Sequence, residues 1–248
     1  VVPHPVDEEG IVLNERPCDY YYVTPGHQVP TGVTMSSARR RQLLEHAARH
    51  DAVIIEDDYD SESNFTLNPL PALKASDRSG RVVYVSSLSK ALSPGLRLGF
   101  MVADPDLIDE ARALRRLVYR HPPTNIQYQM AHFLAQGHYE THLRRYHYDS
   151  AQRWERLHAA LQRYLPSCRA LAGSEHANAF WLQTPAQINT QQLTWRAAHA
   201  GVLIEPGARH FLSAAPPDNY FRMGFHAINP DAIAQGVEVL RGQLEQMG

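Results

Sequence analysis

Short runs of consecutive apolar residues organise the first half of the chain. The runs at Ala52–Glu56 and Arg81–Ser86 are nearly all apolar, which is typical of parallel strands buried on both faces. A third run lies at Leu96–Ala103, and Cys18–Thr24 contains three tyrosines that favour a strand. Since helical segments separate these runs, the pattern predicts an α/β fold with a mainly parallel sheet.

Capping residues mark where the helices begin. Ser36 or Ser37 can cap a helix that runs to about residue 50. Asp104 can cap a helix with Pro105 at its first position, and this helix should run to about residue 120. The following stretch, up to about residue 165, is mostly helical with a break near Gly137.

The pattern of predicted elements changes after about residue 166. Short strands are expected at Ala179–Gln183, Val202–Glu205 and Tyr220–Phe225, and a last helix should begin near Pro230. This half therefore predicts a smaller α+β domain, which long helices join to the first.

Composition excludes several classes of function. The 24 basic and 26 acidic residues leave a formal net charge of -2, so the chain lacks the basic surface that nucleic acids need. No apolar run approaches the length of a membrane span. Cys18 and Cys168 stand far apart without CxxC spacing, which favours a reduced cytoplasm over a disulfide framework or a metal site. Only Lys74 and Lys90 are lysines, and Lys74 is expected to be a solvated loop residue.

The motif SLSKALSPGLRLG follows the second buried strand. Ligands of α/β sheets bind beyond the carboxyl ends of the strands, where this motif would place Lys90 beside Ser87, Ser89 and Arg97. The lysine amine can condense with an aldehyde, and hydroxyls with a guanidinium can hold a phosphate. The alternative is a surface lysine in a strand-end loop.

A cluster of acidic residues, EDDYD, ends the preceding strand. A carboxylate such as Asp57, beside the strand that leads to Lys90, can keep a cofactor's pyridine nitrogen protonated. Tyr59, two residues on, can reach the cofactor's ring oxygen. The alternatives are a solvated acidic loop and a Mg²⁺ site, and the latter explains neither Lys90 nor Arg97.

Arg222 lies within an apolar strand, YFRMGF, of the second half. A half-buried arginine needs an anionic partner, which could be a substrate carboxylate or an acid of the chain itself. Arg209, which follows Glu205-Pro206-Gly207, either lines the site or pairs with an acid.

These motifs, in this order, resemble the fold-type I enzymes of the class I/II aminotransferase group, which depend on pyridoxal 5′-phosphate (PLP). The resemblance covers essentially all 248 residues. It implies that Lys90 forms the Schiff base, that Asp57 binds the pyridine nitrogen and that Tyr59 binds O3′. No metal is implied.

The same resemblance implies the remaining contacts and the domain division. Ser87, Ser89 and Arg97 would hold the phosphate, and Arg222 would bind the substrate carboxylate. Residues 1–120 would be the remnant of a large PLP-binding domain, and residues 121–248 the connecting helices and small domain. The group builds its sites at a two-fold interface, so a homodimer is expected.

Two segments, TPGHQVPTG and IIEDDYDSE, are similar to the effector domains of MocR-type (GabR-like) bacterial regulators. These regulators join a winged helix-turn-helix, which binds DNA, to an aminotransferase-like domain. Aminotransferases carry a cofactor-binding asparagine before Pro-Thr-Gly, where this chain has Val29. His27 and Gln28 would occupy part of that space and contact the substrate.

The resemblance favours an effector-sensing domain, in which an amino compound binds as an external aldimine to PLP on Lys90. A free-standing aminotransferase acting on amino acids is the alternative, and an inert fragment is a third. The winged helix, the ring-stacking aromatic and a glycine-rich phosphate loop would all lie upstream of Val1. The chain is therefore expected to be a truncated cytoplasmic piece that binds PLP weakly or not at all.

Overall fold

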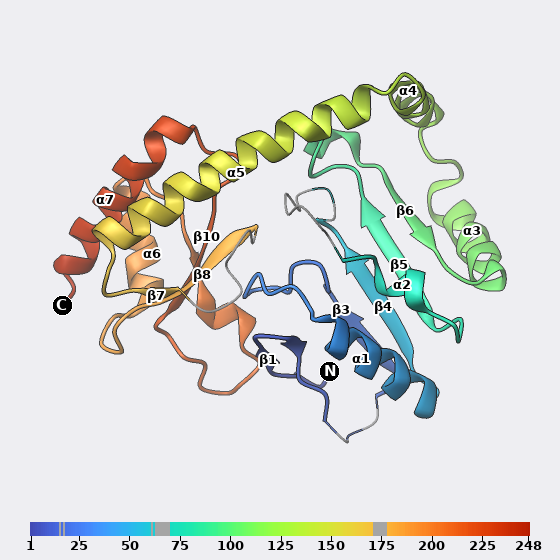
Figure 1. Ribbon diagram of the computed structural model, residues 1–248, viewed down its shortest axis with the longest axis horizontal. Coiled ribbons are helices and arrows are strands. Elements are labelled where there is room, and N and C mark those ends of the chain that lie inside the picture. The colour runs from blue at the N-terminus through green and yellow to red at the C-terminus, as the bar shows by residue number, and fades with distance from the viewer. Residues whose placement is uncertain (15, 17, 61, 63–69, 171–177) are drawn as a thin grey trace. The chain divides into compact units, whose positions relative to one another are not determined.

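The computed structural model describes residues 1–14, 16, 18–60, 62, 70–170 and 178–248 (Figure 1). They form two compact units. The Lys90 unit consists of Glu9–Gly26 and Met35–His147, and the Arg222 unit consists of Val1–Glu8, His27–Thr34 and Tyr148–Gly248. No helix in the described ranges combines the length and hydrophobicity that crossing a membrane requires.

The Lys90 unit alternates strands and helices before it becomes wholly helical. Its elements are β2 (Gly10–Ile11), β3 (Tyr20–Val23), α1 (Ser37–Arg49), β4 (Val53–Asp58), α2 (Leu73–Ser76), β5 (Val82–Ser87), the 3-10 turn η2 (Pro94–Leu96), β6 (Gly99–Val102), α3 (Pro105–Tyr119), α4 (Thr124–Ala135) and the first part of α5 (His138–Tyr164).

A four-stranded sheet with the order β3-β4-β5-β6 forms the centre of this unit (Figure 1). The first three strands are parallel, whereas β6 runs antiparallel to β5. The predicted mainly parallel α/β sheet is therefore confirmed, with β6 as its antiparallel strand. The carboxyl ends of β4 and β5 lie side by side, because Asp57 pairs with Val85 and Asp58 with Ser86.

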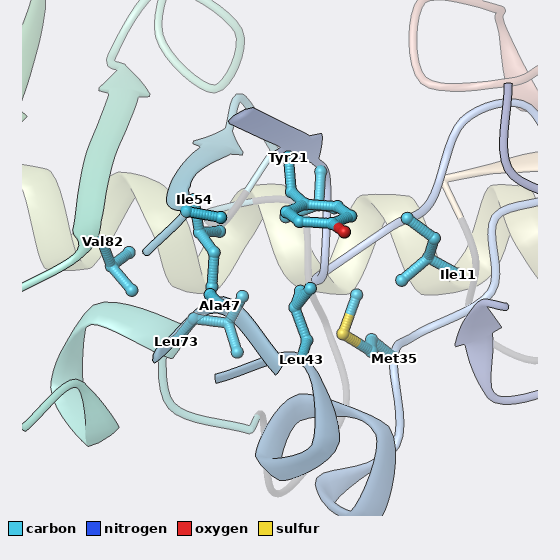
Figure 2. Packing of buried hydrophobic residues seen from close by; sticks show 10 residues of the cluster. Ile11, Tyr21, Met35, Leu43, Ala47, Ile54, Leu73 and Val82 are labelled. Atoms are coloured by element: carbon cyan, nitrogen blue, oxygen red, sulfur yellow. The ribbon is translucent and has the colours of Figure 1, made fainter. Parts of the chain in front are cut away.

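One face of this sheet packs against α1 in an apolar core. Figure 2 shows Leu43 and Ala47 of α1 beside Ile54 of β4 and Tyr21 of β3. The helix begins where the sequence predicts, because the Ser36 side chain accepts a hydrogen bond from the Arg39 amide. The spacing of these buried residues along α1 fixes which face of the helix meets the sheet.

A buried carboxylate joins the end of β4 to the crossover that leads to β5. The two oxygens of Glu56, which is 1% exposed, accept hydrogen bonds from the amides of Leu73 (2.7 Å) and Lys74 (2.9 Å). These are among the first amides of α2, which otherwise has no side-chain cap. Burial raises the pKa of Glu56, while the two amide hydrogen bonds oppose that rise.

Lys74 corrects one prediction from the sequence. It does not lie in solvent: its ammonium donates to the carbonyl of Val82 (2.7 Å) and to Asp77 (3.3 Å). Asp77 also accepts from the Val82 amide at 2.9 Å. Lys74 therefore fastens the start of β5, which leaves Lys90 as the lysine available for chemistry.

The Arg222 unit contains a second sheet and the last helices. Its elements are β1 (Val6–Asp7), the remainder of α5, β7 (Arg169–Ala170), β8 (Ala179–Gln183), α6 (Thr190–His199), β9 (Glu205–Pro206), the 3-10 turn η3 (Gly207–His210), β10 (Tyr220–Gly224), the 3-10 turn η4 (Pro230–Ala232) and α7 (Ile233–Glu245).

The sheet of this unit has the order β7-β8-β10-β9 and is antiparallel throughout. One of its faces carries Phe180, Leu182 and Phe221, all at most 1% exposed. The ring of Trp154 on α5 stacks on Phe180 with centroids 5.7 Å apart. Side chains alternate along strands, so Trp181 and Arg222 project from the opposite face.

Two strand predictions need correction. The strand expected at Val202–Glu205 is instead β9, which begins at Glu205, and the run at Leu96–Ala103 becomes a strand only at Gly99. Ser93 caps η2 there, and Arg97 then adopts a left-handed conformation with φ of 48°, which interrupts an extended chain. Helices α2 and α6 lay outside the predictions.

The contacts of Glu56 predict a large loss of stability when its carboxylate is removed. Glu56→Ala leaves two buried amides without acceptors, so the free energy of unfolding should fall by about 2–5 kcal/mol. Urea denaturation followed by circular dichroism measures this change. Exposed Glu45 of α1 is the control, and Glu45→Ala should change stability by less than about 0.5 kcal/mol.

The raised pKa of Glu56 gives the same experiment a pH dependence. The folded chain holds a proton on Glu56 at a higher pH than the unfolded chain does, so this group stabilises most below its unfolded pKa. That contribution is lost as the pH rises through the folded pKa. The stability difference between wild type and Glu56→Ala should therefore widen on acidification from pH 7 towards the unfolded pKa; a narrowing difference would contradict the assignment.

Candidate functional site

The turn after β5 brings Arg97 beside the segment that carries Lys90. Ser87 pairs with Gly99 in the antiparallel register, and the Leu88 amide donates to the Leu98 carbonyl at 3.0 Å. Gly99 permits this close approach, because a Cβ there would lie 2.7 Å from the carbonyl oxygen of Ser86. Arg97 therefore lies across from the turn that contains Ser89.

Arg97 is a cation without a partner in the described part of the chain. Its side chain is exposed and makes neither an ion pair nor a hydrogen bond with any residue that the structure describes. Ser87 lies on the neighbouring strand end, where its hydroxyl accepts from the Ser89 amide at 3.2 Å. A guanidinium and hydroxyls in this arrangement can receive a phosphate.

Lys90 lies between an acid and an aromatic ring. Its ammonium is 2.6 Å from a carboxylate oxygen of Asp60, although the two groups are not aligned as a hydrogen bond. The same ammonium is 4.7 Å from the centre of the Tyr59 ring. The Asp60 side chain is only 2% exposed and that of Lys90 is 32% exposed, so the amine is accessible from solvent. The structure thus brings Tyr59 and Lys90 together.

Asp57 accepts a hydrogen bond from the hydroxyl of Tyr22, which lies on the neighbouring strand β3. Burial raises the pKa of Tyr22 to about 12, and the hydrogen bond to Asp57 and its negative charge add to the rise. Tyr22 thus orients the carboxylate that the sequence places at the strand end.

The other acids that follow β4 have separate partners. Asp58 accepts from the Tyr84 hydroxyl at 2.7 Å, and Glu62 accepts from that of Tyr139 on α5 at 2.6 Å. Burial raises the pKa of Glu62, although the hydrogen bond from Tyr139 opposes that rise. Among the described residues, no group of three or more histidine, cysteine, aspartate or glutamate side chains could hold a metal ion.

Arg222, the predicted carboxylate-binding residue, lies in the Arg222 unit beside an acid. Its guanidinium is 3.5 Å from a carboxylate oxygen of Glu205, the residue with which it pairs across β9 and β10. The sequence left open whether a ligand or an acid of the chain would be the partner. In the structure the acid is Glu205, at a long distance and through a single nitrogen.

Glu205 has two further partners on η3. Its other carboxylate oxygen is 3.3 Å from the imidazole of His210 and 3.6 Å from the guanidinium of Arg209. Burial lowers the pKa of His210; Glu205 opposes this effect, and Arg222 and Arg209 reinforce it. Arg209 thus pairs with an acid, one of the two roles that the sequence allowed.

His27 and Gln28 are buried in a turn of the Arg222 unit, at 4% and 6% exposure. The backbone amide of Gln28 donates to the backbone carbonyl of Val33 at 2.8 Å, and the backbone carbonyl of Gln28 accepts from the Gly32 amide at 2.7 Å. The side-chain oxygen of Gln28 has no hydrogen-bond partner among the residues that the structure describes. Contact of these two residues with a substrate stays a prediction.

Sequence reasoning missed three residues of these clusters: Tyr22, Asp60 and Glu205. Tyr22 appeared only as a strand-forming aromatic, and its alternation with buried Tyr21 and Val23 would have placed it on the other face. Asp60 stood within the quoted acidic motif without a role. Glu205 was noted only as the residue before Pro206.

The fold and the Lys90 turn define an α/β protein of the aminotransferase type. The chain matches the family described as aminotransferase class I and II over residues 23–240. It therefore belongs to that family.

Solved structures of aminotransferases resemble this chain. The multiple substrate aminotransferase of Thermococcus profundus superposes with a TM-score of 0.90 at 26% identity, over 99% of this chain and 64% of that one. The kynurenine aminotransferase of Pyrococcus horikoshii, solved in complex with PMP, gives a TM-score of 0.89 at 26% identity, over 99% and 63%.

Two curated relatives at higher identity are transcriptional regulators. The chain is 38% identical to the HTH-type transcriptional regulator TauR of Rhodobacter capsulatus, over 94% of this chain and 48% of that protein. It is 34% identical to the probable rhizopine catabolism regulatory protein MocR of Rhizobium meliloti, over 97% and 49%. The chain thus spans about half the length of these relatives.

The contact between Tyr22 and Asp57 predicts an unusual titration. Tyr22 should lose its proton at a pH of about 12, well above the ordinary value of 10.0. Asp57→Asn removes the negative charge, so the pKa of Tyr22 should fall towards the ordinary value while part of the burial effect remains. The tyrosinate absorbance of each protein minus that of its Tyr22→Phe version isolates this one group. An unchanged Tyr22 pKa in Asp57→Asn would show that the pair does not exist in solution.

Proposed function

We propose that this chain is the effector-sensing, aminotransferase-like domain of a MocR-type transcriptional regulator, with PLP bound at Lys90. The observation that carries the proposal is the end of β5, where an accessible lysine amine shares a turn with hydroxyls and with an arginine that has no partner among the described residues. When bound, PLP supplies an aldehyde that condenses with amines and a ring that withdraws electrons.

The residues of the Lys90 unit fit this cofactor. Arg97 lacks a counter-charge in the described part of the chain, which suits a dianionic phosphate beside Ser87 and Ser89. Asp57, which Tyr22 orients, offers the carboxylate that a protonated pyridine nitrogen needs. Tyr59 lies against the Lys90 ammonium, and its hydroxyl would donate a hydrogen bond to the ring oxygen of the cofactor.

Arg222 would bind the carboxylate of an amino-acid-like effector, with His27 and Gln28 as further contacts. Effector binding would shift the balance between conformations of the protein, and an attached winged helix-turn-helix would respond on DNA. Support for this role comes from TauR and MocR, the regulators that the chain resembles at 38% and 34% identity. A homodimer in the cytoplasm is part of the same proposal.

A second candidate is a free-standing aminotransferase. The observation that favours it is the superposition on the enzyme of Thermococcus profundus, with a TM-score of 0.90. Val29 argues against a free-standing aminotransferase, because the aminotransferases that this chain resembles carry a cofactor-binding asparagine at the corresponding position. Rapid turnover of an amino acid with 2-oxoglutarate as acceptor would favour the enzyme. A winged helix encoded in the same gene would favour the regulator.

The two lysines of the chain allow a sharp test of the cofactor site. Because the sequence predicts weak cofactor binding, PLP is added to the purified chain in large excess. A visible absorbance band should then appear, and borohydride should fix the cofactor on the peptide that contains Lys90. Lys90→Ala should abolish both signals, because no other amine stands in this turn. Mass spectrometry of the reduced, digested protein locates the label.

Lys74→Ala is the matched control. Lys74 holds the start of β5 through the Val82 carbonyl, so this variant should lose stability and still bind PLP on Lys90. A label on Lys74, or a band that survives in Lys90→Ala, would contradict the assignment.

A further inference from the structure

Glu205 and Arg222 project from the same face of the sheet in the Arg222 unit. Arg222 pairs with Trp181 of β8 and with Glu205 of β9, and directly paired residues of neighbouring antiparallel strands share a face. Within the residues that the structure describes, Glu205 is the one carboxylate within 4.0 Å of the Arg222 guanidinium. A ligand carboxylate that binds Arg222 must therefore compete with it.

The two oxygens of Glu205 face different cations. Oε2 lies 3.5 Å from Arg222, whereas Oε1 lies 3.3 Å from His210 and 3.6 Å from Arg209. If Glu205 lost Arg222, its carboxylate would keep partners on η3. The Glu205 carboxylate therefore stays paired with Arg209 and His210 when another anion binds Arg222.

The positions of Arg209 and His210 are set by close packing at the start of η3. A Cβ at Gly207 would lie 2.6 Å from the Tyr220 carbonyl and 2.7 Å from the Trp181 ring, so glycine allows the backbone to approach them. The His210 ring also packs edge-on against Trp181, with centroids 5.5 Å apart. This packing thus holds the backbone of η3 and the His210 ring, one of the alternative partners of Glu205, in place.

The pair of Glu205 and Arg222 is weak enough to be exchanged. It rests on one contact of 3.5 Å between side chains that are 33% and 22% exposed. Partly exposed ion pairs of this kind contribute about 0.2–1 kcal/mol. A ligand carboxylate can instead form two shorter, parallel bonds with the guanidinium, which are stronger.

We propose that Glu205 occupies Arg222 in the ligand-free chain and yields it to the carboxylate of an incoming ligand, turning to Arg209 and His210. The inference rests on the proposed function, because it takes Arg222 as the carboxylate-binding residue. It makes Glu205 a residue that determines specificity: a ligand without a carboxylate leaves the pair intact, whereas a carboxylate releases Glu205.

Acetate, the smallest suitable carboxylate, tests the exchange without the cofactor. The side-chain Nε–Hε resonance of Arg222, assigned by its disappearance in Arg222→Lys, should shift as acetate is added to the whole chain. Glu205→Gln removes the competitor, so half of the shift should occur at an acetate concentration about two- to fivefold lower. Glu238→Gln on α7, whose acid pairs with Arg241 at 3.8 Å, is the control and should change nothing.

His210 in the wild-type chain gives an independent readout. The charged groups that face it are Glu205 from β9, Arg222 from β10 and Arg209 on its own turn. When acetate neutralises Arg222 and Glu205 turns towards His210, the pKa of the imidazole should rise. Either an equal or higher acetate requirement in Glu205→Gln or a His210 titration that acetate leaves unchanged would overturn the exchange.

A second pair of ligands separates failure of this inference from failure of the proposed function. With PLP present, calorimetry compares L-leucine with 3-methylbutylamine, which lacks only its carboxylate. Glu205→Gln should tighten L-leucine binding about two- to fivefold and leave the amine unchanged.

If Arg222→Lys weakens L-leucine binding while Glu205→Gln does not tighten it, the exchange is wrong and the proposed function stands. If L-leucine does not bind, or Arg222→Lys leaves its affinity unchanged, the role of Arg222 in the proposed function fails. The acetate titration then still decides whether Glu205 gives up Arg222.

Discussion

The Lys90 unit depends on a carboxylate that is almost completely buried. Glu56 stands on β4 directly before Asp57, and it binds the first amides of α2, which leads the chain to β5. One side chain therefore links the strand that carries the acid to the crossover that delivers the lysine. An isolated buried charge would be very unfavourable, so the two amides and the nearby Arg40 cation make this arrangement possible.

The hydrogen bonds of Glu56 help to fix the positions of the site residues that follow it in the chain. Parallel pairing of β4 with β5 brings Asp57 next to the strand that ends at Ser87, and the turn after it returns Arg97 alongside. The Arg222 unit uses a different principle, in which antiparallel register lines up an arginine with an acid. In each unit, the pairing of strands thus places oppositely charged side chains near one another.

The sequence was sufficient for most elements, and it singled out chemical groups that the structure places at or just after the ends of β4 and β5. Apolar runs located β4 and β5, capping residues located α1 and α3, and the order of the motifs indicated Lys90, Asp57 and Arg97. Contacts between residues distant in sequence were out of reach, because neither periodicity nor spacing states which polar groups meet. The hydrogen bond of Tyr22 with Asp57 and the ion pair of Asp60 with Lys90 are of this kind.

Gly99 shows how a polar site can be lost while every polar group stays in place. A side chain at this position would collide with the carbonyl of Ser86 and push the returning strand outward. The lysine, the acids and the hydroxyls would be unaltered, yet the guanidinium of Arg97 would no longer lie across from them. A descendant of this chain that replaced this glycine but kept each chemical group would therefore have all the residue types of the site. It would lack the arrangement that lets them act together.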